Sequence, residues 1–205
     1  NERNGRLIIK GKGPLEDYLE GGKTCQMKDY DILNPESPWR HEFKNRIRSV
    51  VFCYGVSSIG KFAFYDCRKM TSVIIPNSVT IIDHGAFFNC FALRSVAIPD
   101  GVESIGDHIF WNCLKLNGIF ISKTVTSIGS DPFTMCRKIK SIEIAEGNQH
   151  FVVLDGVLYD KGITRIISIN ACTKKEFRIP KTVTSVGGFD ISDHYIKTIF
   201  VPRGL

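Results

Sequence analysis

Apolar residues recur along most of this chain at a constant interval of 23 residues. Within that interval the same five positions carry an apolar side chain in each copy, so equivalent positions form columns. The columns are Ile47, Met70, Leu93, Leu116 and Ile139; Val56, Val79, Val102 and Val125; Ile59, Ile82, Ile105 and Ile128; Phe64, Phe87, Phe110 and Phe133; and Cys67, Cys90, Cys113 and Cys136. Columns in one register predict stacked units that share a continuous core, because one such unit cannot bury its apolar face alone.

One copy of the repeat, residues 93–115, indicates how each unit is built. Its first part, 93–98, alternates apolar with mostly polar or small residues and predicts a short strand. Pro99 ends this strand because proline cannot donate to a strand ladder. A second extended piece follows at 102–105, and Gly106 then predicts a tight bend with a positive φ. We therefore expect a leucine-rich-repeat solenoid, mostly β, of right-handed stacked 23-residue repeats, with short turns or helical pieces on the far side.

The repeat favours one elongated domain over residues 1–205. Its expected parts are an N-terminal cap at 1–46, four regular repeats at 47–138, a repeat strand with a β-hairpin insertion at 139–176, and a final repeat and strand at 177–205. In the insertion, apolar runs at 151–154, 157–159 and 163–169 predict a β-meander or hairpin.

The N-terminal cap should cover the open end of the core, as terminal units of solenoids do. Leu7 and Ile9 predict an edge strand, and a polar stretch at 20–37 predicts a loop. Trp39, Phe43 and Ile47 follow at i, i+4 and i+8, which predicts one short amphipathic helix.

Composition narrows the class of protein. The 205 residues are 43% hydrophobic, and no apolar run approaches the roughly 18 residues of a membrane-spanning helix, so no span is expected. The net charge of +6 permits an acidic partner without demanding nucleic acid. The first residues, NERNGRL, lack a charged and then apolar leader, which favours a cytosolic protein or a chain whose signal peptide was removed.

Four of the seven cysteines occupy the repeat column that contains Cys90 and Cys113. A column with one thiol per unit does not converge on one point, which argues against a zinc site. A disulfide between adjacent units remains possible on distance, whereas buried free thiols acting as small hydrophobic groups fit the apolar column better.

The motif I-P-x-x-V-x-x-I-G-x-x-A-F-x-x-C-x-x-L resembles the BspA-like (Treponema pallidum type) leucine-rich repeat, and the copy at 75–93 carries it most clearly. The D-G-V-L-Y sequence at 155–159 is similar to a hairpin of bacterial members. Departures from the motif are Asp83 for Gly, Ile109 and Pro132 for Ala, and His194 for Cys. The resemblance implies an exported cell-surface protein of host-associated bacteria, without catalytic residues. Some members bind matrix or plasma proteins such as fibronectin and fibrinogen, or other bacteria.

One outward column of the predicted strands is unexpectedly apolar. It consists of Val51, Ile74, Ala97, Phe120, Glu143 and, after the insertion, Phe200. Polar residues are expected where a strand faces water, so the column indicates either a binding stripe or partial burial by a neighbouring segment.

A second outward column is largely basic. It consists of Arg48, Thr71, Arg94, Asn117, Lys140 and Lys197, and further cations (Arg68, Lys69, Lys115, Arg137 and Lys138) precede the strands. This basic edge could capture an acidic protein segment or a sulfated glycan, or could simply be solvated.

Two histidines, His84 and His108, lie near the bend together with Asp107 and Asp131. Four such residues on neighbouring units could bind a metal ion, but turn residues without a ligand are the simpler interpretation, and we expect no metal, no cofactor and no catalytic group. The hypothesis that follows is a non-enzymatic, adhesin-like cell-surface module that binds a host or bacterial surface or matrix protein, or an acidic glycan. The alternative is a structural spacer that displays a neighbouring domain.

Overall fold

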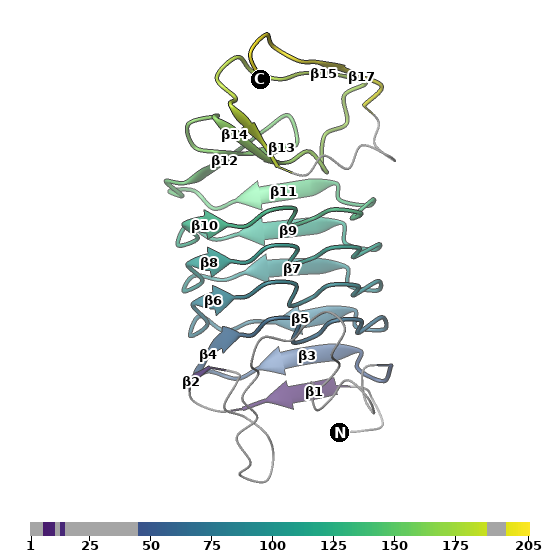
Figure 1. Ribbon diagram of the computed structural model, residues 1–205. Helices are drawn as coiled ribbons and strands as arrows, with labels where there is room; N and C mark the ends of the chain where they lie inside the picture. Colours follow the sequence, from purple (N-terminus) through teal and green to yellow (C-terminus); the bar gives the residue numbers. More distant parts are fainter. Residues whose placement is uncertain (1–5, 11–12, 15–44, 188–195) are drawn as a thin grey trace.

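Short parallel strands stack one above another along the molecule (Figure 1). The computed structural model describes residues 6–10, 13–14, 45–187 and 196–205. Within these ranges there is no helix, and turns alone form the side opposite the first row of strands. The expected loop at 20–37, the helix residues Trp39 and Phe43, and His194 lie outside the described residues.

The strands of the solenoid form two rows, and each of the four regular repeats contributes one strand to both. The first row is β1 (Arg6–Ile9), β3 (Ser49–Phe52), β5 (Ser72–Ile74), β7 (Ser95–Ile98), β9 (Gly118–Ile121) and β11 (Ser141–Ile144). The second row is β2 (Gly13–Pro14), β4 (Val56–Ile59), β6 (Ile81–Ile82), β8 (Ser104–Ile105) and β10 (Ser127–Ile128). Strand β1 pairs in parallel with β3, and β2 with β4, so the predicted edge strand extends the stack by one rung. The predicted leucine-rich-repeat solenoid is confirmed.

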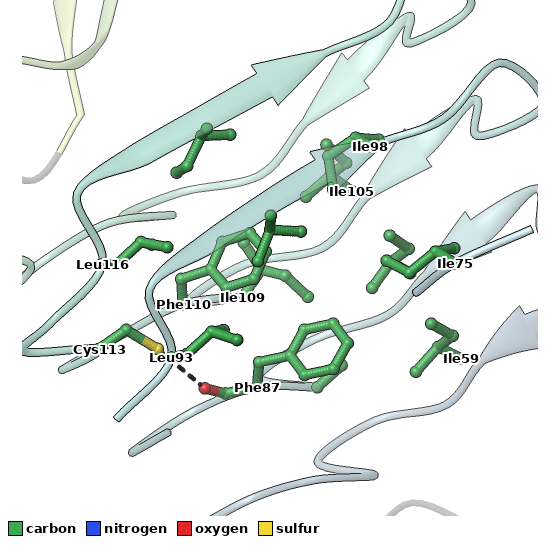
Figure 2. Packing of buried hydrophobic residues seen from close by; sticks show 14 of the residues in the cluster. Ile59, Ile75, Phe87, Leu93, Ile98, Ile105, Ile109, Phe110, Cys113 and Leu116 are labelled. Atoms are coloured by element: carbon green, nitrogen blue, oxygen red, sulfur yellow. Dashed lines mark hydrogen bonds between the residues drawn. The ribbon is translucent and has the colours of Figure 1, made fainter. Parts of the chain in front are cut away.

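The phenylalanine column forms the centre of the core. The rings of Phe64, Phe87 and Phe110 stack with centroids 5.8 and 5.5 Å apart, and Phe133 continues the stack at 6.0 Å. All four side chains are buried, each at most 2% exposed. Figure 2 shows Phe87 and Phe110 surrounded by the aliphatic columns. Equivalent residues therefore lie above one another, as the sequence predicts.

The bend differs from the expectation for Gly106. Two columns of each repeat have a positive φ, and Gly106 belongs to neither. They are Phe62 (51°), Gly85 (56°), His108 (51°) and Asp131 (50°), and four residues later Asp66 (63°), Asn89 (61°), Asn112 (59°) and Met135 (62°). The left-handed conformation thus begins two residues after the glycine position, and the prediction of a positive φ at Gly106 is wrong.

Gly106 is needed instead for close approach between rungs. A Cβ atom there would lie 2.4 Å from the backbone nitrogen of His84, and one at Gly129 would lie 2.5 Å from that of Asp107. Asp83 occupies the same column one rung earlier, and its Oδ1 accepts a hydrogen bond from the His84 amide at 2.6 Å. This column is therefore selected by packing and capping, not by a left-handed backbone.

The cysteine column forms a ladder of thiol hydrogen bonds. Cys90 Sγ donates to Phe64 O at 3.2 Å, and Cys136 Sγ donates to Phe110 O at 2.9 Å. Cys113 makes the same contact to Phe87 O at 3.2 Å (Figure 2). No disulfide joins the cysteines of the described residues, and the four members of the column are buried, which confirms the interpretation as buried thiols. Because a thiolate has no proton to donate, the ladder requires protonated sulfur.

We expect Cys90 and Cys113 to resist alkylation in the folded protein. Burial raises the pKa of both thiols well above the ordinary 9.0, so little thiolate is present at mildly alkaline pH. The thiolate is the reactive form and both sulfur atoms are shielded from solvent, so iodoacetamide should modify both residues at least about tenfold more slowly than the half-buried Cys53. Peptide mass spectrometry over a time course would measure this, with urea-unfolded protein as the control in which all sites react. Equal rates in the folded state would contradict the ladder.

The insertion forms the predicted meander. Strands β12 (Phe151–Leu154), β13 (Val157–Asp160) and β14 (Arg165–Ser168) are consecutively antiparallel. Asp155 and Gly156 join the first two with φ of 52° and 77°, the pair of positive values that a type I′ hairpin turn requires. Phe151 and Leu158 pack into the core of the solenoid, so the insertion covers its last regular rung.

The final segment does not simply resume the earlier ladder. Strand β16 (Ser185–Val186) pairs in parallel with β14 of the insertion, while β15 (Glu176–Arg178) and β17 (Thr198–Phe200) pair only with each other. A second buried cluster, which includes Tyr159, Phe177 and Ile196, lies beneath these strands. The assignment of 177–205 as a final repeat, and of the whole chain as one domain, stays a prediction.

Candidate interaction surface

The first outward column of the strands is held in register by backbone hydrogen bonds. The amide of Thr71 donates to Arg48 O at 2.7 Å, and that of Arg94 donates to Thr71 O at 3.3 Å. Asn117 and Lys140 continue the series with two bonds of 2.8 Å. Because each amide bonds to the carbonyl one rung earlier, the five residues lie above one another at the usual strand spacing of about 4.7–4.9 Å.

The predicted apolar column is exposed. Strand pairing aligns Ile8 with Val51 and Val51 with Ile74, and a second set of pairs aligns Ala97 with Phe120 and Phe120 with Glu143. Ile8 is 46% exposed, Ile74 58% and Phe120 41%. We call Ile8, Val51, Ile74, Ala97 and Phe120 the apolar stripe. Partial burial, the other interpretation of the sequence, applies only to Val51.

Ile8 is a member of the stripe that the sequence analysis missed. It stands between Leu7 and Ile9, which were identified as a strand, and Ile9 points into the core at 7% exposure. The alternation of a strand then directs Ile8 outward. The sequence therefore contained this signal, because alternation along the strand alone determines on which face the Ile8 side chain lies.

Phe200 lies apart from the stripe. Its strand, β17, pairs with β15 and not with any strand of the regular rungs. The guanidinium of Arg178, its partner in the register, lies 3.7 Å from the ring centroid. The structure therefore does not bring Phe200 into the column with Phe120, and one of its faces is covered.

The cations of the basic edge are exposed at the start of the strands. Arg48, Arg94 and Lys140 form no ion pair with the carboxylates of the described residues. The turn residues Lys69, Lys115, Arg137 and Lys138 are also exposed. We call these seven residues the basic edge, and the edge together with the apolar stripe is the strand face. Excess positive charge on one edge gives the surface a potential that attracts anionic groups.

Two of the predicted cations are placed differently. Arg68 Nε contacts Asp66 Oδ1 at 2.6 Å, and its guanidinium lies 5.1 Å from the ring centroid of Phe91, so its charge is already compensated. Lys197 belongs to the C-terminal sheet, where its amide donates to Lys175 O at 2.7 Å. Neither side chain extends the column that ends at Lys140.

The histidines lie in the turns, half-buried. His84 Nδ1 is 3.7 Å from Asp107 Oδ2, and His108 Nδ1 is 4.0 Å from Asp131 Oδ2. In the part of the chain that the structure describes, no three metal-ligating side chains converge. Each contact links one rung to the next, as turn residues of stacked units would.

A row of aromatic rings on the turn side escaped the sequence analysis, although Tyr65, Phe88 and Trp111 also recur every 23 residues. Their ring centroids lie 5.4 and 5.8 Å apart, and His108 packs edge-on against Trp111 at 4.9 Å. The planes of Phe88 and Trp111 differ by only 3°, so their faces cover one another. Rings whose faces are already paired hold neighbouring turns together and offer little face to a ligand.

The repeat and the fold have counterparts among known proteins. Residues 41–154 match the BspA type leucine rich repeat region in 6 copies. A leucine-rich repeat protein from Eubacterium ventriosum is similar over 98% of this chain and 56% of its own, at 28% identity and a TM-score of 0.71. The pneumococcal vaccine antigen PcpA is similar over 75% of this chain and 44% of its own, at 21% identity and a TM-score of 0.55. No curated protein matches the chain.

A leucine rich cell surface protein from Faecalibacterium prausnitzii is also similar, over 77% of this chain and 55% of its own, at 23% identity and a TM-score of 0.51. The chain thus spans between 44% and 56% of the length of these three relatives. In the described ranges, no helix has the length and apolar character that crossing a membrane requires.

Proposed function

The chain belongs to the BspA-type leucine-rich repeat family, and from that premise we propose that it is a non-enzymatic, adhesin-like module of a bacterial cell surface that binds a protein ligand through its strand face. The observation that carries the proposal is the exposure of the apolar stripe, since Ile8, Ile74 and Phe120 are between 41% and 58% exposed at the equivalent outward position of their strands. Large apolar side chains gathered on one surface are typical of interaction sites.

The positive charge of the basic edge supports the same function. Its cations lie beside the stripe, so one ligand could place apolar groups on Phe120 and acidic groups on Arg94 or Lys140. Aromatic and arginine side chains are the types that contribute most at protein interfaces. A surface location agrees with the description of the Faecalibacterium relative as a cell surface protein. A spacer that only displays another domain would have no need of an exposed apolar stripe.

The test is binding to immobilised matrix and plasma proteins, measured by biolayer interferometry with the wild type and two face variants. Phe120→Ser should weaken binding of any ligand found by at least about tenfold, a typical loss for a central aromatic contact. The matched control is Leu154→Ser, which changes another large apolar residue, 44% exposed, in the hairpin insertion.

Reversal of three edge cations, Arg94→Glu, Arg137→Glu and Lys140→Glu together, should slow association and remove its salt dependence. The control reverses Lys123, Lys181 and Arg203, which alters the net charge by the same amount outside the strand face. Binding that both face variants retain would refute the proposed use of this surface. If heparin binds the wild type with the same dependence on the edge cations, the ligand would be an acidic glycan instead of a protein.

A further inference from the structure

The strand face has a period of two rungs, although the sequence repeats every rung. Cations occupy the basic column on alternate rungs, at Arg48, Arg94 and Lys140, with the neutral Thr71 and Asn117 between them. The large exposed residues of the apolar stripe occupy the other rungs. They are Ile8 on β1, Ile74 on β5 and Phe120 on β9, while the rungs between carry the half-buried Val51 and the small Ala97.

Small residues separate the two columns. The intervening outward positions are Ser49, Ser72, Ser95, Gly118 and Ser141, which strand pairing aligns within each sheet. Their side chains leave room for a ligand backbone between the cations and the apolar residues, and the serine hydroxyls can donate to its carbonyl groups. Glu143 ends the stripe at β11, beyond Phe120 in the same column.

The spacing selects among regular peptide conformations. Two rungs span about 9.4–9.8 Å at the usual strand separation. Three residues of a polyproline II helix span about 9.3 Å, so equivalent side chains of such a helix recur in step with alternate rungs. Same-face residues of an extended strand recur about every 6.6 Å, and two turns of an α-helix span about 10.8 Å, so neither stays in step with three successive cations.

Resting on the function proposed above, we infer that the ligand segment is a polyproline II helix with an acidic residue at every third position, lying along the stack on the strand face. Its carboxylates contact Arg48, Arg94 and Lys140, and its proline rings pack on Ile74 and Phe120. Exposed apolar and aromatic surfaces are the usual receptors for this helix, whose backbone needs no strand edge. Arg94 is the decisive cation, because an extended strand could reach both outer cations and still miss the middle one.

The test uses the intact chain and fluorescent peptides of one composition, measured by fluorescence anisotropy. One probe repeats Pro-Pro-Glu, and its isomer carries the same residues with all glutamates in a terminal block. The repeating probe should bind about tenfold more tightly than the isomer, since only the repeating probe aligns three exposed ion pairs. Arg94→Gln should abolish this preference, whereas Lys123→Gln, an exposed cation outside the face, should keep it.

A charge-reversal variant gives a gain of binding, which an unfolded protein would not show. The variant with Arg48, Arg94 and Lys140 changed to glutamate should lose the Pro-Pro-Glu probe and gain a Pro-Pro-Lys probe. Equal binding of the two isomers, tighter binding of an alternating Val-Glu peptide, or no binding of any probe would overturn the inference. The proposed function would survive these outcomes if matrix-protein binding still depended on Phe120, so the two failures are distinguishable.

Discussion

Replacement of Phe87 with alanine should lower the free energy of unfolding by about 3–5 kcal/mol, the usual cost of truncating a buried phenylalanine. Phe87 is 0% exposed and its ring is stacked between Phe64 and Phe110, with interplanar angles of 15° and 6°. The cavity would open in the middle of the column, where rings from the two adjacent rungs cannot close it without moving their backbones.

Urea unfolding followed by circular dichroism would measure the loss. Phe120→Ala is the matched control, because this ring is 41% exposed on the strand face and its truncation should change stability by only about 0.5 kcal/mol. A loss of less than 1 kcal/mol at Phe87, or equal losses at both positions, would mean that the phenylalanine column is not the centre of the core.

Asn148→Ala should destabilise the protein by about 3 kcal/mol or more, since each buried partner left without a hydrogen bond costs roughly 1–3 kcal/mol. The Asn148 side chain is buried at the junction between the last regular repeat and the insertion. Its Nδ2 donates to Ser122 O at 3.0 Å and to Val125 O at 3.1 Å. Its Oδ1 accepts from the amides of His150 at 2.8 Å and Phe151 at 2.9 Å.

The loss should be local to the junction. Hydrogen exchange of the His150 and Phe151 amides should accelerate in Asn148→Ala, while amides in β7 keep their protection. The exposed Asn117→Ala serves as control and should leave both unchanged. If Asn148→Ala were no less stable than the control, water would have to replace all four hydrogen bonds.

The sequence was sufficient to predict the rungs and not the turns between them. A buried column such as the phenylalanines is visible at a fixed period because every rung imposes the same packing. The first left-handed column carries residues as different as Phe62, Gly85 and His108, so no residue type marks it, whereas the second is mostly Asp and Asn, which tolerate this conformation. The difference lies in the first column. The amides of Phe62, Gly85 and His108 donate to carbonyls of the following rung, each at 2.9 Å, and this stacking stabilises a conformation that is uncommon for Phe and His.

The candidate surface was predictable as far as the repeat extends. Exposure of Ile74 and Phe120 followed from strand parity, because alternate side chains face opposite sides. Phe200 was misplaced because the insertion interrupts the register, and its strand finds a new partner in β15. Asn148 was missed because it occurs once, at a junction, where no repetition draws attention to it.

The regular hydrogen bonding between rungs also determines how the molecule would respond to force. The amides of Thr71, Arg94, Asn117 and Lys140 each donate to the rung one repeat earlier. Tension applied along the stack would therefore break these bonds one rung after another instead of all at once. Each released rung would lengthen the chain by up to about 80 Å, the extended span of one repeat. A stack of this kind would therefore extend in small steps under a pull, and each step would absorb part of the applied work.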